Sequence, residues 1–364
     1  MKTIMIRGFI LLALFTGLIL AGCSKPTEPD EQVSKPVFSP AGGAYEGAVE
    51  IIITTSTLGT TIQYTTDGSD PNSTSLIYSV PIRVSETTTL KAKAYRNGMR
   101  DSAVASASYT ISLPTIPASF VLVSGGTFNN GTSNVTVSSF YLDKYELTQA
   151  GYQAVMGSNP ASEYGVGSNY PVYCVSWFNA IEYCNRRSLQ EGLTPCYSYS
   201  TYGTNPATWP AGWNTSSGNH TNVSCSWTAT GYRLPTEAEW QFAAQGGNQN
   251  NNYTYSGSND INAVAWYSSN SGSTTHTVGT KAANELGIFD MSGNVWEWNW
   301  DIYGSYQSGS QNNPTGASSG SHRVLRGGSW FNSANYCTVS HRSYNDATNS
   351  YNGSLGFRCV RVSP

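Results

Sequence analysis

From Ala118 to the end of the chain, long stretches rich in Gly, Asn and Ser are interrupted by only three segments with helix signals. One begins at Thr148 and another after Ser176, both residue types that cap helices, and apolar residues follow at helical spacing. The third begins at Thr236, where Glu239 completes a capping box. Long loops in such number usually carry function or are stabilised by bound ions. The pattern predicts a mixed α and β domain built largely of ordered loop.

Charged residues make up only 11% of the chain, and the net charge is -3. The surface must therefore consist mainly of Ser, Thr, Asn, Gly and Tyr, which is typical of exported β-rich proteins and disfavours long salt-bridged helices. The charge also excludes a nucleic-acid partner, because such a partner requires a basic surface. The 24 tyrosines and 10 tryptophans supply large apolar areas for a core.

The N-terminal residues have the features of a signal peptide. Two positive residues precede an apolar run from Phe9 to Leu20, which is too short to span a bilayer comfortably. The following Leu-Ala-Gly-Cys sequence resembles the bacterial lipobox, in which the cysteine becomes the lipidated N-terminus. Residues 1–22 are therefore predicted to be a signal peptide and Cys23 a lipidation site. An ordinary signal peptide with a chance cysteine is the alternative.

Residues 23–35 are rich in proline and acidic residues and are predicted to be a flexible tether. In the lipoprotein resemblance, Ser24 after the cysteine favours the outer membrane. The expected location is therefore the outer membrane and cell surface, where the N-terminal lipid is the contact with the membrane.

Residues 36–112 are strand-like throughout. Short β-branched and aromatic runs such as Val49–Ile53 and Thr61–Thr65 are separated by turn signals, which predicts a small β-sandwich. The sequences Phe38–Gly43 and Tyr64–Pro71 resemble the Ig-like chitobiase C-terminal-type domain, which implies a spacer or accessory role. A proline-containing linker follows.

A series of motifs runs through residues 118–362. It resembles the sulfatase-modifying-factor family, which includes the formylglycine-generating enzyme. The resemblance implies an α+β C-type lectin-like fold for residues 118–364. The motifs are Gly125–Phe128, Tyr145–Thr148, Val175–Trp177, Tyr232–Trp240, Asn284–Gly287, Met291–Trp298, Leu325–Trp330 and Leu355–Arg358.

The oxidases of this family use two cysteines after the Gly-Gly-Ser-aromatic motif to bind copper. Soft thiolates are the ligands that Cu(I) prefers, so the chemistry needs both sulfurs. In this chain the first position is Asn332, and only the second is a thiol, Cys337. We therefore expect no copper, no catalytic residues and no enzyme activity, with Cys337 as a structural residue.

The family resemblance also implies a calcium ion beside the Ser-Gly-Asn-aliphatic-Trp-Glu motif. The corresponding residues are Asp290, Gly293, Val295 and Glu297. Carboxylate and carbonyl oxygens are the ligands that Ca²⁺ prefers, and the ion would stabilise loops. The alternative is a turn stabilised by Asp290 beside a buried, hydrogen-bonded Glu297.

Residues 331–354 contain no Lys, Glu, Gln, Met or Trp. These five types share the property that no codon ending in a pyrimidine encodes them, so randomising the first two bases of Asn codons would never produce them. The segment thereby resembles the variable proteins of diversity-generating retroelements, which diversify a C-type lectin-like scaffold. A polar, Asn-rich loop without diversification is the alternative.

Within this segment Ala334, Cys337, Val339 and Arg342 are expected to be framework, and their alternation with varied positions suggests a strand with one buried face. The predicted ligand-binding positions are Phe331, Asn332, Ser333, Asn335, Tyr336, Thr338, Ser340, His341, Ser343, Tyr344, Asn345, Asp346, Thr348, Asn349, Ser350, Tyr351, Asn352 and Gly353.

This composition is that of an antibody paratope, in which tyrosines give rigid contact area and Ser and Asn give adaptable hydrogen bonds. The sequence therefore predicts a surface-displayed, monomeric lipoprotein that binds an unknown protein or cell-surface ligand. A formylglycine-generating-type oxidase and a non-diversified structural or adhesive lipoprotein are the alternatives. Six cysteines besides Cys23 are either disulfide-bonded or buried thiols.

Overall fold

The computed structural model describes residues 31–47, 49–112, 115–350 and 352–363. Its contacts divide the chain into two units, with most residues up to Tyr109 in the first and most residues from Thr110 onward in the second. The predicted signal peptide and Cys23 lie outside the described residues. Within the described part of the chain, no helix is both long enough and apolar enough to cross a membrane.

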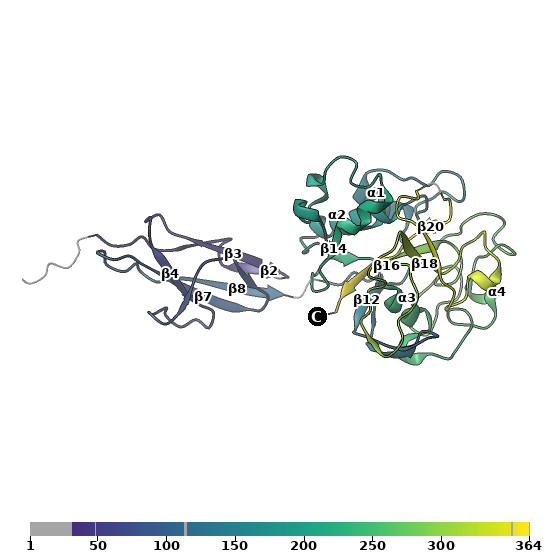
Figure 1. Ribbon diagram of the computed structural model, residues 1–364, viewed down its shortest axis with the longest axis horizontal. Helices are drawn as coiled ribbons and strands as arrows, with labels where there is room; N and C mark the ends of the chain where they lie inside the picture. The colour runs from purple at the N-terminus through teal and green to yellow at the C-terminus, as the bar shows by residue number, and fades with distance from the viewer. Residues whose placement is uncertain (1–30, 48, 113–114, 351, 364) are drawn as a thin grey trace, which may run out of the picture. The chain divides into compact units, whose positions relative to one another are not determined.

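The N-terminal unit is a β-sandwich of two antiparallel sheets (Figure 1). The first sheet has the order β1-β3-β6, and the second has the order β2-β8-β7-β4-β5. The strands are β1 (Val37–Ser39), β2 (Gly43–Glu46), β3 (Val49–Thr54), β4 (Thr61–Thr65), β5 (Leu76–Ile77), β6 (Ile82–Val84), β7 (Thr88–Tyr95) and β8 (Ala105–Ser112).

Alternating side chains explain how these strands form a sandwich. Ile51 and Ile53 of β3 are buried, while Leu90, Ala92 and Ala94 of β7 are buried from the other sheet. Lys91 and Lys93 occupy the intervening positions of β7, whereas in β3 the intervening Ile52 is apolar but exposed. Each sheet therefore buries one of its two faces. The all-β sandwich predicted for this region is confirmed.

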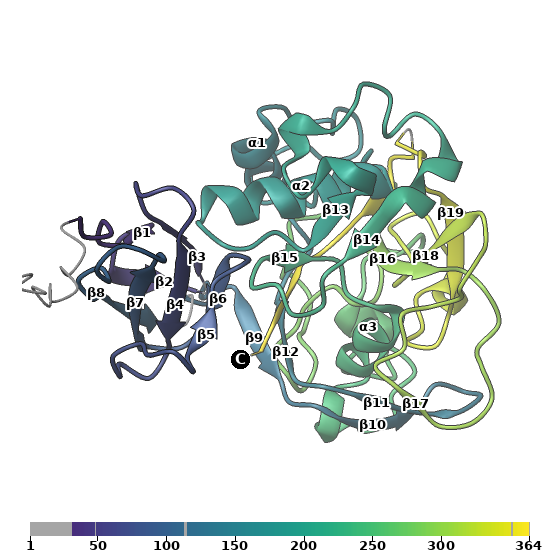
Figure 2. The same ribbon diagram turned by 60° about the vertical axis from the view of Figure 1, so that its left-hand side comes forward.

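The C-terminal unit contains four small sheets connected by long loops (Figure 2). Their orders are β10-β11-β17, β15-β21-β12-β9, β13-β14 and β19-β18-β16-β20. The strands are β9 (Phe120–Val123), β10 (Gly126–Asn129), β11 (Asn134–Val137), β12 (Phe140–Asp143), β13 (Tyr197–Tyr199), β14 (Val223–Cys225), β15 (Tyr232–Arg233), β16 (Trp296–Ile302), β17 (Gln311–Asn312), β18 (His322–Arg326), β19 (Ser343–Asp346), β20 (Leu355–Gly356) and β21 (Val360–Val362).

The three predicted helices begin where the capping residues indicated. Thr148 accepts the backbone N–H of Gly151, and both Ser176 and Thr236 form complete capping boxes. The helices are α1 (Gln149–Met156), α2 (Trp177–Gln190), α3 (Glu237–Ala244) and α4 (Ile261–Val264), with 3₁₀ turns η1 (Ser200–Tyr202), η2 (Pro206–Thr208), η3 (Ser217–Asn222), η4 (Gly247–Gln249) and η5 (Ala334–Tyr336).

A buried ion pair lies at the centre of this unit. Arg358 donates two hydrogen bonds of 2.7 Å to the carboxylate of Glu297, and both side chains are fully buried. The indole N–H of Trp240 on α3 donates to the same carboxylate at 2.8 Å. The pair therefore connects β16 and α3 with the segment that precedes β21.

Candidate functional site

The predicted ligand-binding positions lie at the surface of the C-terminal unit. Tyr351 lies outside the described residues, and none of the other seventeen positions is buried. Phe331, Tyr336 and Tyr344 are 71%, 39% and 50% exposed, which is unusual for large aromatic side chains. We name residues 331–353 the recognition segment.

Framework positions of the recognition segment are oriented the other way. Cys337 and Val339 are buried, and Ala334 packs beside Cys337 against Ile261 and Ala265. Ala334 and Arg342, the other two predicted framework positions, are half-buried, as are many of the predicted contact positions.

The expectation of one strand across the framework positions is wrong for the first half of the segment. Residues 334–336 form the 3₁₀ turn η5, and only Ser343–Asp346 form a strand, β19, which pairs with β18. A 3₁₀ turn satisfies the first part of the pattern, because Ala334 and Cys337 are three residues apart and therefore lie on the same side of the turn.

Arg326, at the end of β18, binds the backbone of the recognition segment on its buried side. Its fully buried guanidinium donates to the carbonyl oxygens of Val339 and Ser340 at 3.0 Å and to that of His341. Sequence reasoning did not assign this role, although Arg326 lies within the Leu-Arg-Gly-Gly-Ser-Trp motif. A guanidinium offers five donors in a rigid fork, which suits three converging carbonyl groups.

Gly328 and Trp330 fix the two ends of the segment. A Cβ atom at Gly328 would lie 2.7 Å from the sulfur of Cys337, and its φ of +75° favours glycine. The nearly buried Trp330 donates from its indole N–H to the carbonyl oxygen of Gly353 at 3.0 Å. The start and end of the segment are therefore joined through one tryptophan.

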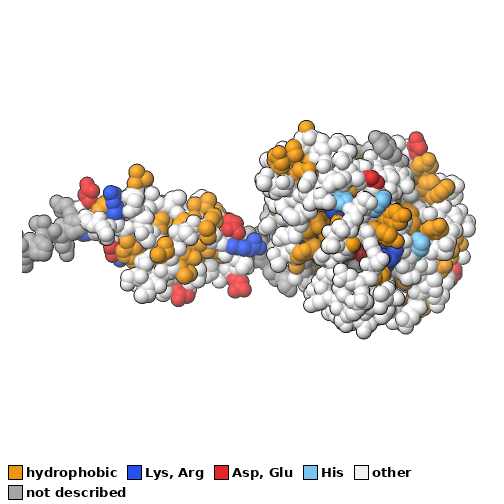
Figure 3. Space-filling model, viewed as in Figure 1, with side chains coloured by type: hydrophobic (Ala, Val, Ile, Leu, Met, Phe, Trp, Pro, Cys, Tyr) orange, Lys and Arg blue, Asp and Glu red, His pale blue; other side chains and the backbone are white. Residues whose placement is uncertain are grey.

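Ring contacts orient the exposed aromatic residues. Tyr344 packs against Tyr303 and His322, with ring centroids 4.5 and 4.9 Å apart. Tyr336 packs edge-on against His341 at 4.8 Å. Figure 3 shows hydrophobic and histidine side chains gathered near the middle of one face of this unit, with few charged groups around them.

Some polar positions of the segment also stabilise its turns. The carboxylate of Asp346 accepts the N–H and hydroxyl of Thr348 at 2.9 and 2.6 Å. The amide oxygen of Asn352 accepts the N–H of Ser354 at 2.9 Å. These two positions are half-buried or exposed, yet they shape the loop as well as the surface.

A cavity of about 550 Å³ adjoins the end of the segment. Ser350 and Gly353 line it together with Tyr164, Tyr173 and Glu163, which precede α2 in the sequence. A ligand could therefore contact the exposed side chains of the recognition segment and also insert a group into this cavity.

The two positions that hold the copper-binding cysteines in the family's oxidases, Asn332 and Cys337, do not provide two thiols in this chain. Asn332 accepts a hydrogen bond of 2.6 Å from the hydroxyl of Ser329, and Cys337 lies in an apolar environment. Burial raises the pKa of Cys337 to about 12, so its thiol is protonated at neutral pH. Among the described residues, no second cysteine sulfur contacts Cys337, and no group of three or more His, Cys, Asp or Glu residues is placed to hold a metal.

The six described cysteines are free thiols. The sulfur atoms of Cys184 and Cys359 lie 3.9 Å apart, and both side chains are buried. Of the two alternatives for these residues, the structure has free thiols, which are buried except at the half-buried Cys174 and Cys225.

The four residues of the expected calcium site are brought together, but their arrangement does not fit a divalent cation. Both oxygens of Glu297 accept hydrogen bonds from Arg358, so an arginine already neutralises this carboxylate. Asp290 accepts the N–H of Gly279 at 2.7 Å, and burial raises its pKa to about 6. The arrangement matches the alternative of a stabilised turn, and calcium binding stays a prediction.

Glu146, from the Tyr-Glu-Leu-Thr motif, is a residue that sequence reasoning did not assign. Its buried carboxylate accepts the backbone N–H of Val295 at 2.9 Å and the side-chain amide of Asn294 at 2.7 Å. Burial raises the pKa of Glu146 well above its usual range. Glu146 therefore fixes the loop before β16. In the same loop, the backbone carbonyl oxygen of Asn294 accepts the backbone N–H of Trp330.

Comparison with known proteins identifies the family of the C-terminal unit. Residues 112–363 match the sulfatase-modifying factor enzyme 1-like domain. The chain belongs to this family. Residues 40–106 match the chitobiase/beta-hexosaminidase C-terminal domain, in agreement with the Ig-like sandwich.

Relatives include both enzymes and proteins named for other roles. Chaperone protein LppX of Paenibacillus barcinonensis is 39% identical over 68% of this chain and 90% of that protein. The formylglycine-generating enzyme of Mus musculus is 28% identical over 62% of this chain and 67% of that protein. Treponema denticola variable protein 1 is similar in structure, with a TM-score of 0.59 and 33% identity, over 67% of this chain and 95% of that one. The C-terminal unit thus has the C-type lectin-like fold expected from its motifs.

Proposed function

We propose that this chain is a lipid-anchored, surface-displayed binding protein that recognises its ligand through the recognition segment and is not an oxidase. The observation that carries the proposal is the separation of side chains within residues 331–353. The described predicted contact positions are accessible, whereas Cys337, Val339 and Ala347 between them are buried.

The anchoring of this segment supports a diversified face. Its backbone is held by Arg326, Gly328 and Trp330, none of which is a predicted contact position. Accessible side chains on such a scaffold can change with little effect on the core, because surface substitutions usually alter stability by less than about 0.5 kcal/mol. The likeness to a protein named a variable protein supports the same proposal.

The oxidase alternative has less support from the residues of the site. An amide at position 332 supplies no thiolate, and the Cys337 thiol is buried and protonated. We expect the copper-treated protein to produce no formylglycine from a cysteine-containing sulfatase peptide, while a formylglycine-generating enzyme does so in a parallel assay. Turnover above the protein-free control would reinstate the oxidase.

The gene locus tests diversification directly. We expect a second copy of the coding sequence for residues 331–353 nearby, differing from the gene only opposite adenines of that copy, together with a reverse transcriptase gene. Independent isolates should then differ at the predicted contact positions and agree at Arg326, Gly328 and Trp330. A locus without such a repeat would leave a non-diversified adhesive or structural lipoprotein.

A further inference from the structure

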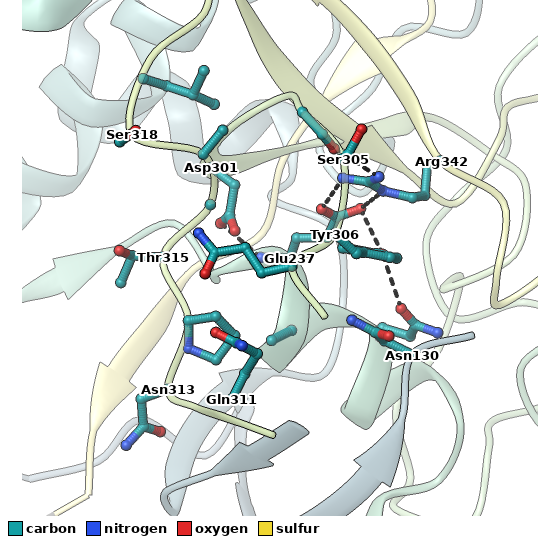
Figure 4. Close-up of a pocket in the computed structure, with 18 of the residues that line it drawn as sticks. Asn130, Glu237, Asp301, Ser305, Tyr306, Gln311, Asn313, Thr315, Ser318 and Arg342 are labelled. Carbon is teal, nitrogen blue, oxygen red and sulfur yellow. Dashed lines mark hydrogen bonds and ion pairs between the residues drawn. The ribbon is translucent and has the colours of Figure 1, made fainter. Parts of the chain in front are cut away.

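A second cavity, of about 410 Å³, opens beside the start of α3 and the end of β16 (Figure 4). Its buried floor consists of Glu237, Gln241 and Asp301. Its walls come mainly from the loop between β16 and β18, which contributes hydroxyl and amide groups such as Ser305 and Asn313. Residues of the recognition segment that are predicted to vary do not line this cavity.

The two carboxylates of the floor differ in their partners. Glu237 is neutralised by Arg342, which donates to its two oxygens at 2.6 and 2.7 Å, and it also accepts the hydroxyl of Tyr306 at 3.1 Å. Asp301 accepts one hydrogen bond, from the backbone N–H of Glu237 to Oδ2 at 2.8 Å. Among the described residues, no Lys or Arg nitrogen pairs with Asp301, and its Oδ1 accepts no hydrogen bond.

Asp301 is nevertheless only 3% exposed. The neighbouring guanidinium of Arg323 donates to the carbonyl oxygens of Trp300 and His220 instead. Gly316 closes the other side, because a Cβ atom there would lie 2.7 Å from the Cβ of Asp301. A buried carboxylate without a paired cation is costly, so burial and the neighbouring charge of Glu237 raise the pKa of Asp301 well above its usual range. The cavity is the direction from which a cation can reach this carboxyl group.

We propose that this cavity binds a primary ammonium group, with Asp301 as its counter-ion. A single available oxygen suits the point charge of an ammonium group better than a guanidinium, whose planar fork binds two oxygens at once. Gln241 and Tyr306 place further acceptor oxygens at the floor. Apart from Arg342, whose guanidinium is paired with Glu237, the walls carry no charge, and their hydroxyl and amide groups suit a ligand that has polar groups beyond its amine.

Two sources share this chemistry: the side chain of a lysine in a partner polypeptide and a free amino compound that carries hydroxyl groups. Either would occupy a site that no position predicted to vary lines, because Arg342, the one residue of the recognition segment beside it, is a predicted framework position. The proposal therefore does not depend on diversification, and the locus experiment above can fail without affecting it.

Calorimetric titration of the purified full-length protein tests the site. The probes are Nα-acetyl-lysine methylamide for the polypeptide source and glucosamine for the free amine. Their neutral counterparts are the Nε-acetylated lysine derivative and N-acetylglucosamine. We expect at least one amine to bind at least tenfold more tightly than its neutral counterpart, and the tighter of the two amines identifies the source.

The variant Asp301→Asn should weaken amine binding at least tenfold. It should still fold, because the asparagine oxygen can accept the N–H of Glu237 in place of the carboxylate. Asp260→Asn is the matched control: it removes one exposed carboxylate of the same unit outside the cavity and should leave binding unchanged. Absence of amine binding, equal binding by D301N, or binding of the neutral counterparts as tight as that of the amines would overturn the proposal.

Discussion

Arg326 has no contact with solvent, yet its guanidinium donates to three backbone carbonyls beneath the exposed segment. We expect Arg326→Lys to lower the free energy of unfolding by roughly 2–4 kcal/mol, because an ammonium group cannot supply the same converging donors. Urea denaturation measures the change. In Arg186→Lys, which alters a partly exposed pair with Glu182, the loss should stay below about 1 kcal/mol. Equal losses in the two variants would contradict the role assigned to Arg326.

Asp143 on β12 provides a test of pH dependence. Burial raises its pKa to about 6, and the guanidinium groups of Arg187 and Arg358 oppose the shift. The folded state therefore binds the proton more tightly than the unfolded state, and the stability from this group is lost as pH rises from about 4 to above 6.

Asp143→Asn keeps this position neutral at every pH. Relative to the original protein, the variant should gain roughly 2–3 kcal/mol in free energy of unfolding between pH 4 and pH 7.5. Urea denaturation of both proteins at the two pH values gives this difference. A relative gain in the opposite direction would show that Asp143 is charged and paired in the folded state.

At the scale of structural elements, truncating an exposed side chain of the recognition segment should affect stability less than truncating a side chain that anchors the segment. Tyr336→Ala and Tyr344→Ala should each change the melting temperature little, because both side chains are well exposed. Trp330→Ala should instead cost roughly 3–5 kcal/mol, since Trp330 is nearly buried and is bonded to Gly353. Thermal unfolding measures all three. Comparable losses at the tyrosines would mean that they support the fold and are not free to vary.

The elements differ in how far sequence alone could predict them. Helices α2 and α3 could be predicted because Ser176 and Thr236 cap their N-termini through hydrogen bonds to residues nearby in the sequence. The contact between Arg326 and the backbone carbonyls after Cys337 could not be predicted, because every residue has a backbone carbonyl and the residue type does not show which of them a distant arginine reaches. The same is true of the cavity at Asp301, which joins residues from α3, β16 and a long loop.

For the whole molecule, the proposed attachment to a membrane rests on Cys23, which lies outside the described part of the chain. Cells grown with labelled palmitate should incorporate the label into the protein, and Cys23→Ser should abolish incorporation and release the protein from the membrane fraction. Protease added to intact cells should degrade the anchored protein if it is displayed outside. Labelling that persists in the serine variant would place the lipid elsewhere or contradict the lipobox.

Strand β21 follows the recognition segment in the chain, yet it lies inside a sheet, between β12 and β15. A ribosome must therefore translate the codons of every position predicted to vary before it makes the strand that completes this sheet. A base substitution in those codons leaves the strand intact, whereas a premature stop or a shift of reading frame removes it and leaves Leu142 and Tyr232 without their neighbour. If the gene is diversified as proposed, this order of strands would let variants that are altered but in frame complete the sheet, whereas interrupted copies would lack its inner strand.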